Sequence, residues 1–350
     1  MRNFTFKRQL LFVMFMLLGC LSIQAADDGL ITKQITIKLD KAGTLPDKIG
    51  STKKKQITNL KIIGEINGTD WCFIREMAGC DYNCEKTGGK LSMLDLSDAK
   101  IVKGGLPYIK YNGGVYTSND KLGYAAFSDC SGLTSLIIPS SVTSIGEYAF
   151  DGCSGLTSLT IPSSVTSIGE YAFYGCSGLT SLTIPSNVTS IGESAFHGCS
   201  GLTSLTIPSS VTSIGYCAFL GCSGLTSFTI PSSVTSIGWG AFCGCSGLTS
   251  IYVYTEKLPN MGSDVFDGCD AKKCTVYVPK GTYNDYWLSE FGYFENIVEY
   301  DPTGIDKVTT STDAKELSRY SVNGQRLSAP AKGLNIVKYS DGSVKKVAVQ

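Results

Sequence analysis

The chain has 350 residues, in which 30 lysines and arginines balance 30 aspartates and glutamates, and only 17% of the residues are charged. A chain without net charge lacks the basic stripe that neutralises nucleic-acid phosphates, so we exclude a nucleic-acid-binding protein. A single histidine and few charged groups also argue against acid–base catalysis. An apolar fraction of 43% nevertheless predicts a packed core.

Residues 1–25 have the pattern of a secretory signal peptide. Three basic residues precede an apolar run at 10–18, which is too short to span a bilayer. Ala25 supplies a small residue for cleavage, so the mature chain should begin at Ala26. The alternative is a lipoprotein signal, in which Cys20 carries the lipid. No later stretch is long and apolar enough for a membrane helix, so we expect an extracellular or outer-surface protein without a transmembrane segment.

Residues 26–121 are predicted to form an N-terminal cap. They contain two imperfect copies of the repeat described below, ITNLKIIGEINGTDWCFIREMAG at 57–79 and LSMLDLSDAKIV at 91–102. Terminal repeats are expected to be irregular, because one of their faces meets water. The cysteines of this segment lack the paired Cys-x2-Cys spacing and the nearby histidine of zinc sites, so we favour unpaired thiols or one local disulfide. These cysteines are Cys72, Cys80 and Cys84.

Residues 122–254 repeat one pattern at a fixed period of 23 residues. The period is marked by a series of cysteines and a series of prolines. The two series are Cys130, Cys153, Cys176, Cys199, Cys222 and Cys245, and Pro139, Pro162, Pro185, Pro208 and Pro231. Such a period predicts a solenoid, in which each 23-residue unit, here called a rung, buries one face against the next rung.

Each rung should begin with a short strand. We expect Leu156, Leu159 and Ile161 to point into the core. Because side chains alternate along a strand, Thr157 and Thr160 should point outward. Strands of successive rungs stacked at ~4.8 Å would then form one continuous core.

The rest of the rung should return the chain to the next strand. Pro162 has no N–H to donate and should therefore close the strand. Gly169 should turn the chain, and Ala172 with Phe173 should pack a short helical turn against the opposite wall.

The six repeated cysteines are expected to be reduced and buried. Stacked equivalent positions lie within disulfide reach, but their side chains point the same way into the core, and a ladder of six offers no reason to pair. Buried cysteine commonly acts as a small apolar residue, so we expect no hydrogen-bond partner for a hydroxyl group at these positions. Cys269 and Cys274 are separate candidates for closing a small loop near the C-terminal cap.

The repeated order Cys-x2-Leu-x2-Leu-x-Ile-Pro-x2-Val-x2-Ile-Gly-x2-Ala-Phe closely resembles the 23-residue leucine-rich repeats of the BspA-like surface proteins of bacteria. The resemblance is close over 122–254 and weaker on both sides. It implies a right-handed leucine-rich-repeat solenoid, with short parallel strands on one face and short helical or irregular turns on the other. Proteins of this family are typically secreted or surface-attached, and several are implicated in adhesion to host matrix proteins or to other cells.

The C-terminal part departs from the repeat. Residues 255–301 are predicted to form an irregular last repeat and a C-terminal cap. Residues 302–350 are predicted to form a small β appendage, because Asn323-Gly324 and Asp341-Gly342 are hairpin turn signals. This tail is similar to about the last half of the C-terminal sorting tails of exported Bacteroidetes proteins. The alternative is an appendage that only seals the solenoid.

Variation among the rungs is concentrated beside the Ala-Phe pairs. Aromatic residues on an exposed edge favour protein recognition, because they bury much area at low entropic cost. The candidate binding residues are Tyr148, Tyr171, Tyr174, His197, Tyr216 and Trp239. The alternative interpretation is that these side chains only cover gaps between turns. A second candidate is the loop 106–124, which contains Tyr108, Tyr111, Tyr116 and Tyr124.

We expect no catalytic site, no cofactor and no metal. His197 occupies a position that varies between rungs, so we expect it to be exposed and without an orienting partner. Glu147, Glu170 and Glu193 form a like-charge row at rung spacing, which indicates a solvated edge and not a pair of catalytic acids.

The sequence therefore predicts an exported cell-surface module that binds or adheres to a protein ligand, with host matrix or other surface proteins as suspected partners. Two alternatives remain open. One is a structural surface scaffold without a dedicated ligand. The other is a glycan-binding accessory protein that contacts polysaccharide through its aromatic edge and its uniform Ser/Thr face.

Overall fold

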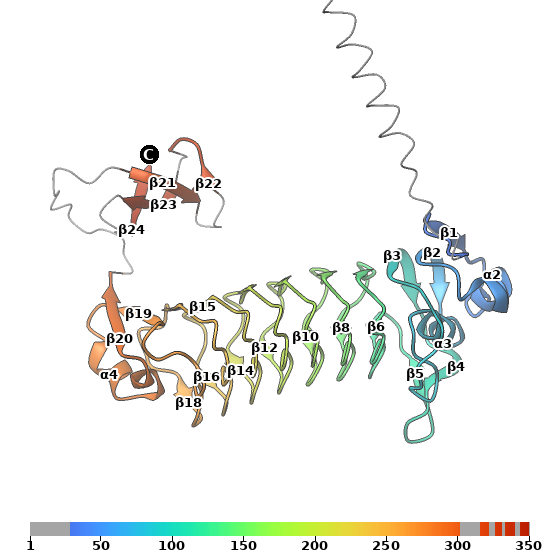
Figure 1. Ribbon diagram of the computed structural model, residues 1–350, viewed down its shortest axis with the longest axis horizontal. Helices are drawn as coiled ribbons and strands as arrows, with labels where there is room; N and C mark the ends of the chain where they lie inside the picture. The colour runs from blue at the N-terminus through green and yellow to red at the C-terminus, as the bar shows by residue number, and fades with distance from the viewer. Residues whose placement is uncertain (1–28, 302–315, 322–325, 331–332, 340–343, 350) are drawn as a thin grey trace, which may run out of the picture.

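The computed structural model describes residues 29–301, 316–321, 326–330, 333–339 and 344–349. The expected signal peptide, the cleavage site before Ala26 and the alternative lipid-bearing Cys20 lie outside the described residues. The rungs follow one another along the longest axis of the molecule and form a repeat solenoid, as expected (Figure 1).

One parallel ladder begins in the N-terminal region and continues through the rungs. Its strands pair in three successive groups, β1-β2-β3-β7-β9, β11-β13 and β15-β17-β19-β20. The strands are β1 (Ile35–Lys38), β2 (Asn59–Ile66), β3 (Met93–Ile101), β7 (Ser135–Ile137), β9 (Ser158–Thr160), β11 (Ser181–Thr183), β13 (Ser204–Thr206), β15 (Ser227–Ile230), β17 (Ser250–Val253), β19 (Thr275–Pro279) and β20 (Asn296–Tyr300). The first part of each rung is thus the predicted short strand.

The predicted inward and outward faces of this ladder are confirmed. Leu156, Leu159 and Ile161 are buried, whereas Thr157 and Thr160 are exposed. The exposed threonines before the strands also join the rungs, since the hydroxyl of Thr157 donates to the carbonyl of Thr134 at 3.1 Å. The Ser/Thr surface therefore takes part in the stacking besides keeping the sheet hydrated.

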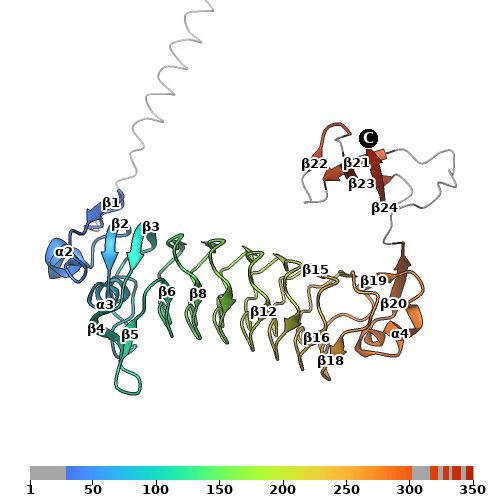
Figure 2. The ribbon, with the colours of Figure 1, turned by 180° about the vertical axis from the view of Figure 1, so that it is seen from behind.

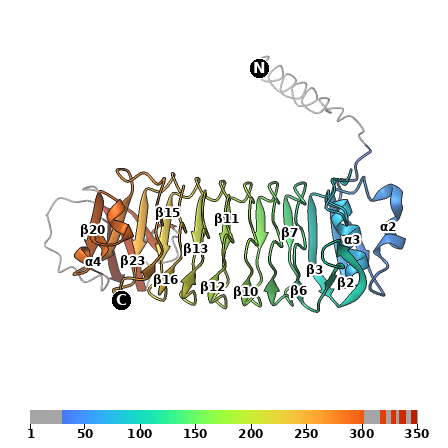
Figure 3. The ribbon, with the colours of Figure 1, turned by 90° about the horizontal axis from the view of Figure 1, so that it is seen from below.

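A second parallel ladder was not predicted. It pairs two-residue strands in the orders β10-β8-β6 and β12-β14-β16-β18, and it runs beside the first ladder along the same axis (Figure 3). The strands are β6 (Lys121–Leu122), β8 (Ser144–Ile145), β10 (Ser167–Ile168), β12 (Ser190–Ile191), β14 (Ser213–Ile214), β16 (Ser236–Ile237) and β18 (Asn260–Met261). In isolation a Ser-Ile pair is too short to show strand periodicity, and only stacking makes it a strand.

The Ala-Phe segments form turns and not helices. Throughout 122–254, all of which is described, the structure assigns strands and turns but no helix. The segments close on themselves, because Cys176 N–H donates to the carbonyl of Phe173 at 3.2 Å. They also join the rungs, because Phe150 N–H donates to the carbonyl of Ala172 at 2.8 Å. Of the two options expected for this wall, the irregular turn is the one present.

The core of the rungs is built from identical columns of side chains. The phenylalanines stack ring on ring, with centroids 5.1–5.8 Å apart and interplanar angles of 2–16°. This column consists of Phe127, Phe150, Phe173, Phe196, Phe219, Phe242 and Phe266. Offset stacking adds to the burial of each ring, so every rung stabilises its neighbours in the same way.

The repeated cysteines are buried free thiols, as expected. The expectation that they behave only as apolar residues is wrong. The Sγ of Cys176 lies 3.1 Å from the carbonyl oxygen of Phe150, and the Sγ of Cys199 lies 3.1 Å from that of Phe173. The thiols of the five repeated cysteines from Cys153 to Cys245 donate in this way to a buried carbonyl of the preceding rung, so the core does supply a hydrogen-bond acceptor.

The N-terminal region covers one end of the phenylalanine column. It contains α2 (Leu45–Lys53) and α3 (Gly68–Met77), and Asn67 begins α3 in a capping box with Asp70. The ring of Trp71 packs against Phe127 at 5.1 Å, and its Nε1 donates to the carbonyl of Ala126 at 2.9 Å. This aromatic contact replaces the rung that is missing at that end.

The other end is covered by α4 (Tyr283–Trp287) and the 3-10 helix η1 (Glu290–Tyr293) (Figure 2). Phe291 and Phe294 each lie 5.0 Å from the ring of Phe266. Tyr286 donates its hydroxyl to the carbonyl of Thr255 at 2.9 Å. Aromatic side chains thus close the core at both ends.

The C-terminal tail forms its own antiparallel sheet in the order β22-β21-β23-β24. The strands are β21 (Glu316–Ser321), β22 (Arg326–Leu327), β23 (Gly333–Tyr339) and β24 (Val344–Val349). The predicted turn residues, Asn323-Gly324 and Asp341-Gly342, lie outside the described residues. The resemblance of this tail to a sorting module stays a prediction.

Candidate functional site

The variable residues beside the Ala-Phe pairs lie on one surface, which we call the turn edge. It has three positions in each rung: the second residue before Ala, the residue directly before Ala, and the residue directly after Phe. The backbone at the second position is left-handed in successive rungs, with φ values from 49° to 59°. These residues are Tyr148, Tyr171, Ser194, Cys217 and Gly240. The backbone is therefore the same from rung to rung, although the side chains differ completely.

The predicted binding residues do not form a single row. Tyr216 and Trp239 occupy the first position, Tyr148 and Tyr171 the second, and Tyr174 and His197 the third. Sequence spacing alone placed them on one edge, but it did not show which of them touch.

Ring contacts join most of them into a chain that crosses the three positions. Tyr148 stacks on Tyr171 at 4.8 Å with an interplanar angle of 10°. Tyr171 then contacts Tyr174 at 6.1 Å, and Tyr174 contacts His197 at 4.5 Å. In the other direction, Tyr148 meets Tyr124 edge-on at 5.7 Å.

The chain of contacts continues into the second predicted site. The loop contains a hairpin of β4 (Gly104–Ile109) and β5 (Val115–Thr117). Tyr111 lies between these strands, is 51% exposed, and stacks on Tyr124 at 5.1 Å. We call the whole set the tyrosine strip. It consists of Tyr111, Tyr124, Tyr148, Tyr171, Tyr174 and His197. The two sites predicted separately are thus one continuous surface.

Tyr108 belongs to the core and not to a binding loop. It is 1% exposed, lies 6.4 Å from the ring of Trp71, and donates its hydroxyl to the carbonyl of Tyr124 at 2.9 Å. This hydrogen bond fixes the hairpin against the first rung. Tyr116 is exposed on the hairpin but makes no ring contact with the tyrosine strip among the described residues.

Tyr216 and Trp239 are exposed but lie outside the ring contacts of the strip. The indole Nε1 of Trp239 donates to the carboxylate of Asp264 at 2.9 Å. The second-position side chains between them and the strip are Ser194 and Cys217, which offer no ring to continue the stacking. These two aromatic residues therefore serve as a natural comparison for the strip.

Hydrogen bonding and burial keep the side chains of Tyr171 and His197 uncharged at pH 7. The hydroxyl of Tyr171 donates to the carboxylate of Glu193 at 2.7 Å, and this bond raises the pKa of Tyr171 to about 12. Burial lowers the pKa of His197, so the imidazole is neutral at pH 7. His197 is half-buried against Tyr174 and not exposed as expected. It contributes a ring and no positive charge.

The outer face of the first ladder forms a second surface. Its central column is threonine in β9, β11, β13 and β15 and becomes aromatic at the C-terminal end. There Tyr252 pairs with Thr229 on one side and with Tyr277 on the other, and the two tyrosine rings stack at 4.8 Å. The uniform Ser/Thr face thus ends in a small aromatic platform.

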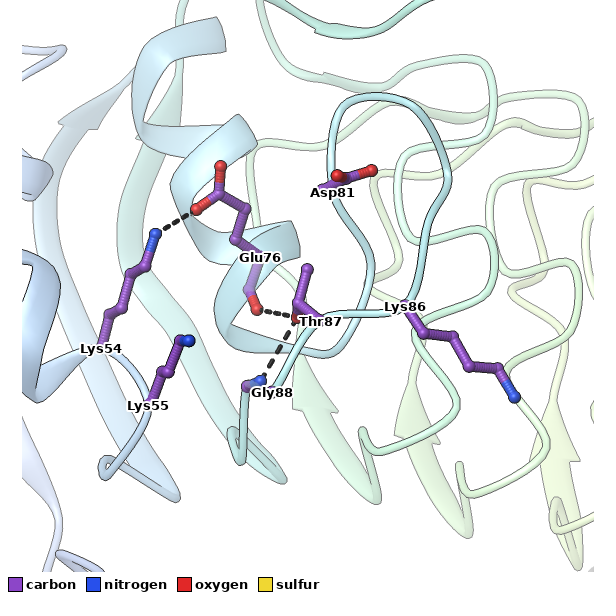
Figure 4. A pocket seen from close by; sticks show the side chains of 8 residues that line it. Lys54, Lys55, Glu76, Asp81, Lys86, Thr87 and Gly88 are labelled. Atoms are coloured by element: carbon purple, nitrogen blue, oxygen red, sulfur yellow. Dashed lines mark hydrogen bonds and ion pairs between the residues drawn. The ribbon is translucent and has the colours of Figure 1, made fainter.

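A polar hollow of about 400 Å³ lies in the N-terminal region (Figure 4). Lys54 points to Glu76 and pairs with its carboxylate, whereas Lys86 points away from the other lining side chains (Figure 4). The hydroxyl of Thr87 donates to the backbone carbonyl of Glu76 at 2.6 Å. Its charges do not converge, so the hollow forms no anion clamp.

Residues 72–84 contain an unusual buried arginine. Arg75 is fully buried, and its Nη1 donates to the carbonyls of Ala125 and Ala126 at 2.8 and 3.1 Å. Its Nη2 lies 3.3 Å from the Sγ of Cys80 and 4.0 Å from the Sγ of Cys84. The side chain therefore joins α3 to the first rung.

The cysteines of the two caps, for which the sequence left a disulfide open, are all free thiols in the part of the chain that the structure describes. They are Cys72, Cys80, Cys84, Cys269 and Cys274. Within the same part of the chain, no group of three or more His, Cys, Asp or Glu side chains is arranged to hold a metal ion. The helices that the structure describes are also too short or too polar to cross a membrane.

Comparisons with known proteins agree with the repeat. The family model for the BspA type leucine rich repeat region matches six copies, at residues 120–249 and 166–289. A leucine-rich repeat protein of T. pallidum is 34% identical over 47% of this chain and 74% of its own chain, with a TM-score of 0.42. No curated protein matches the chain.

Two further solved structures are similar at lower identity. A leucine-rich repeat protein from Bacteroides ovatus is 24% identical over 55% of this chain and 62% of its own, with a TM-score of 0.39. A leucine rich cell surface protein from Faecalibacterium prausnitzii is 22% identical over 76% and 87%, with a TM-score of 0.29. With its six matched repeats and the stacked columns that they form, the chain belongs to the BspA-type leucine-rich repeat family.

Proposed function

We propose that the protein is an exported cell-surface module that binds a protein ligand through the tyrosine strip. Its family consists of bacterial surface proteins with an interaction or scaffold role, which supports a binding function over a catalytic one. The observation that carries the proposal is the unbroken series of ring contacts from Tyr111 to His197.

The strip has the properties of a recognition surface. Tyr111 and Tyr174 are 51% and 38% exposed, while Tyr124, Tyr148 and Tyr171 are partly buried against one another. The mutual stacking restricts the rings before any ligand arrives, so little rotamer entropy remains to be lost on binding. Tyrosine also offers an apolar face together with a hydroxyl group, which is the combination enriched at binding hot spots.

The position of the strip explains how specificity arises in a repetitive chain. Stacked rungs at ~4.8 Å place the ring chain along roughly 20 Å of one edge, which is enough for a contact area of a few hundred Å². The inward anchors of the same rungs do not vary. A ligand can therefore be selected by edge side chains without any change in the core.

The proposal is tested by removing the rings and measuring binding. The Tyr148→Ser/Tyr171→Ser/Tyr174→Ser variant should bind immobilised matrix proteins at least ~30-fold more weakly than wild type, or about 2 kcal/mol. The matched control, Tyr216→Ser/Trp239→Ser, removes two exposed rings outside the strip and should change affinity less than about threefold. Melting curves of both variants show whether the fold is retained.

Three outcomes contradict the assignment to the strip. Equal losses in both variants would extend the site to the whole turn edge. Unchanged affinity in both would move the site to another surface. Absence of binding to every probe by the wild-type protein would favour the structural scaffold that the sequence left open.

A neutral polysaccharide is the second candidate ligand, favoured by the outer face of the first ladder. Hydroxyl groups at a constant rung spacing lead there to the stacked pair Tyr252–Tyr277. Aromatic faces are well suited to sugar rings, and the hydroxyl array repeats like the polymer itself. Loss of polysaccharide binding in Tyr252→Ser/Tyr277→Ser, with the tyrosine strip intact, would support this candidate.

A further inference from the structure

The charges of the regular rungs are all of one sign. Between residues 122 and 254 the sequence contains five acidic side chains and no lysine or arginine. The acidic residues are Asp129, Glu147, Asp151, Glu170 and Glu193. Four of them occupy turn-edge positions, and Asp129 lies one residue beyond the third position of the first rung, so the segments around the Ala-Phe pairs carry the entire formal charge of these rungs.

The carboxylates are interleaved with the tyrosine rings. Glu147 and Glu170 are exposed and directly precede Tyr148 and Tyr171, while Glu193 accepts the hydrogen bond from Tyr171 at 2.7 Å. The surrounding carboxylates also contribute, after burial, to the raised pKa of Tyr148. The strip is therefore a mixed surface, in which aromatic faces alternate with negative charges.

Among the residues that the structure describes, none of the five carboxylates takes part in an ion pair. Successive rungs bring Glu147, Glu170 and Glu193 into one like-charge row, and such a row is repulsive at low ionic strength. A cationic ligand would relieve this repulsion on binding, whereas an acidic one would add to it.

Building on the proposed function, we infer that the tyrosine strip binds a lysine- or arginine-rich segment of a protein. The cationic groups lie against Glu147 and Glu170 and over the faces of the neighbouring tyrosines. Ammonium and guanidinium groups are attracted both to carboxylates and to aromatic faces, so the two kinds of side chain act on the same ligand group. The aliphatic stems of lysine and arginine cover the rings between these contacts.

Other ligand chemistries use this surface less well. A uronic or sulfated polysaccharide meets repulsion along the whole row, and a neutral polymer has no use for the carboxylates. A second copy of this chain is a competing source of positive charge, because residues 29–121 contain 15 lysines and arginines against 10 aspartates and glutamates. The experiment therefore separates a foreign segment from self-association.

The test uses the full exported chain and a fluorescein-labelled 12-residue peptide of alternating Lys and Gly. Fluorescence anisotropy should show binding at 50 mM NaCl and at least tenfold weaker binding at 300 mM, because surface attraction is screened by salt. The same peptide with Glu in place of Lys should not bind. Glu147→Gln/Glu170→Gln should weaken binding of the Lys peptide about tenfold, as expected for the loss of two exposed charges.

A matched control separates local from general charge effects. Glu65→Gln/Glu256→Gln removes two exposed carboxylates outside the regular rungs and should leave affinity within twofold of wild type. Equal effects of the two glutamine variants would overturn the inference, since only net charge would then matter. Self-association of the wild type at 50 mM NaCl that excludes the peptide, seen by sedimentation velocity, would overturn the assignment to a foreign partner.

The inference can fail while the proposed function stands. If the tyrosine variant loses binding to a matrix protein but the glutamine variant keeps it, the strip is the site and its ligand is not selected by positive charge. If a neutral glucan displaces the Lys peptide, the cationic ligand class is wrong as well.

Discussion

The core columns and the turn edge belong to the same rungs, but they obey different rules. Every rung places phenylalanine and cysteine at 0–1% exposure in the regular core, and the phenylalanine rings stack nearly parallel. Two residues before each phenylalanine, the second edge position holds Tyr, Tyr, Ser, Cys and Gly on a backbone whose φ stays between 49° and 59°. The core columns therefore determine the backbone conformation of each rung, and the edge side chains vary without changing that conformation.

This difference shows how a repeat protein can acquire specificity. Substituting a core column disturbs contacts with the rungs on both sides, so such changes are costly. A turn-edge side chain such as Tyr216, which is 58% exposed, leaves the stacked core columns intact when it changes, so it is freer to vary. The predictions below test this separation, from the largest expected effect to the smallest.

The largest loss is expected in the phenylalanine column. Phe196 stacks on Phe173 at 5.2 Å and on Phe219 at 5.3 Å and is fully buried. Phe196→Ala should lower the free energy of unfolding by ~3–5 kcal/mol, because it leaves a cavity between two rungs. Tyr216→Ala, on the edge, should change it by less than about 0.5 kcal/mol. Urea unfolding followed by circular dichroism measures both, and similar losses would show that the edge is part of the core.

A smaller loss is expected in the cysteine column. Cys176→Ser keeps a donor for the carbonyl of Phe150, which lies 3.1 Å from the present sulfur. We expect a cost of ~1 kcal/mol for burying the more polar hydroxyl in this site. Cys176→Ala loses the donor and leaves a small void, so it should cost more than the serine variant. The reverse order in urea unfolding would mean that the thiol acts mainly as an apolar group.

At the second edge position, opposite substitutions should have opposite effects. Ser194 has φ 49° and Gly240 has φ 59°, in a region where any side chain is strained. Ser194→Gly should raise the free energy of unfolding by about 1 kcal/mol, and Gly240→Ser should lower it by about the same amount. A Cβ at Gly240 would meet only ordinary contacts, 3.5 Å from the Sγ of Cys217. The Gly240→Ser variant therefore measures the cost of backbone strain without a contribution from steric crowding. Effects of the same sign in thermal unfolding would refute this explanation.

The smallest effect concerns the pH dependence of stability. Burial, followed by the neighbouring carboxylate of Asp129, raises the pKa of Asp151 from 3.8 to about 6. Because the folded-state pKa is the higher one, this group contributes stability below pH 4 that is lost as the pH rises through about 6. Asp151→Asn should remove this dependence and be more stable than wild type at pH 7.5, by less than about 1 kcal/mol for a half-exposed group. A stability difference between the two proteins that is equal at pH 4.5 and 7.5 would contradict the assignment.

Much of the fold was predictable because the repeat is physically redundant. A residue such as Leu156 or Phe173 recurs in every rung, so its inward position follows from period and apolar character alone. The second ladder was not predictable in the same way, because Ser167-Ile168 is too short to show a pattern before it is stacked. The thiol–carbonyl bond of Cys176 was missed as well, because sequence carries no information on where a backbone carbonyl points.

For the candidate site, the sequence identified the edge but not its connections. Tyr171 and Trp239 appeared equivalent by spacing, yet only Tyr171 has neighbouring rings to stack on. Tyr108 was expected on a binding loop but is a core residue. Its ring can be buried there because its hydroxyl donates to the carbonyl of Tyr124. The absence of lysine and arginine from the rungs was visible in the sequence, but its meaning depended on finding Glu147, Glu170 and Glu193 beside the tyrosine rings.

The sequence by itself determined that the chain is a solenoid, which columns are buried and where variation is allowed, because a strict period repeats the same local preferences in every rung. The tertiary structure decided which variable side chains share a surface. Tyr111 and Tyr124 come from a hairpin and the first rung, and Tyr174 and His197 from the far side of the Ala-Phe turns. They meet because stacking of the rungs brings residues that are far apart along the chain to within a few ångströms of one another on the edge. A local sequence pattern carries no information on such a distance.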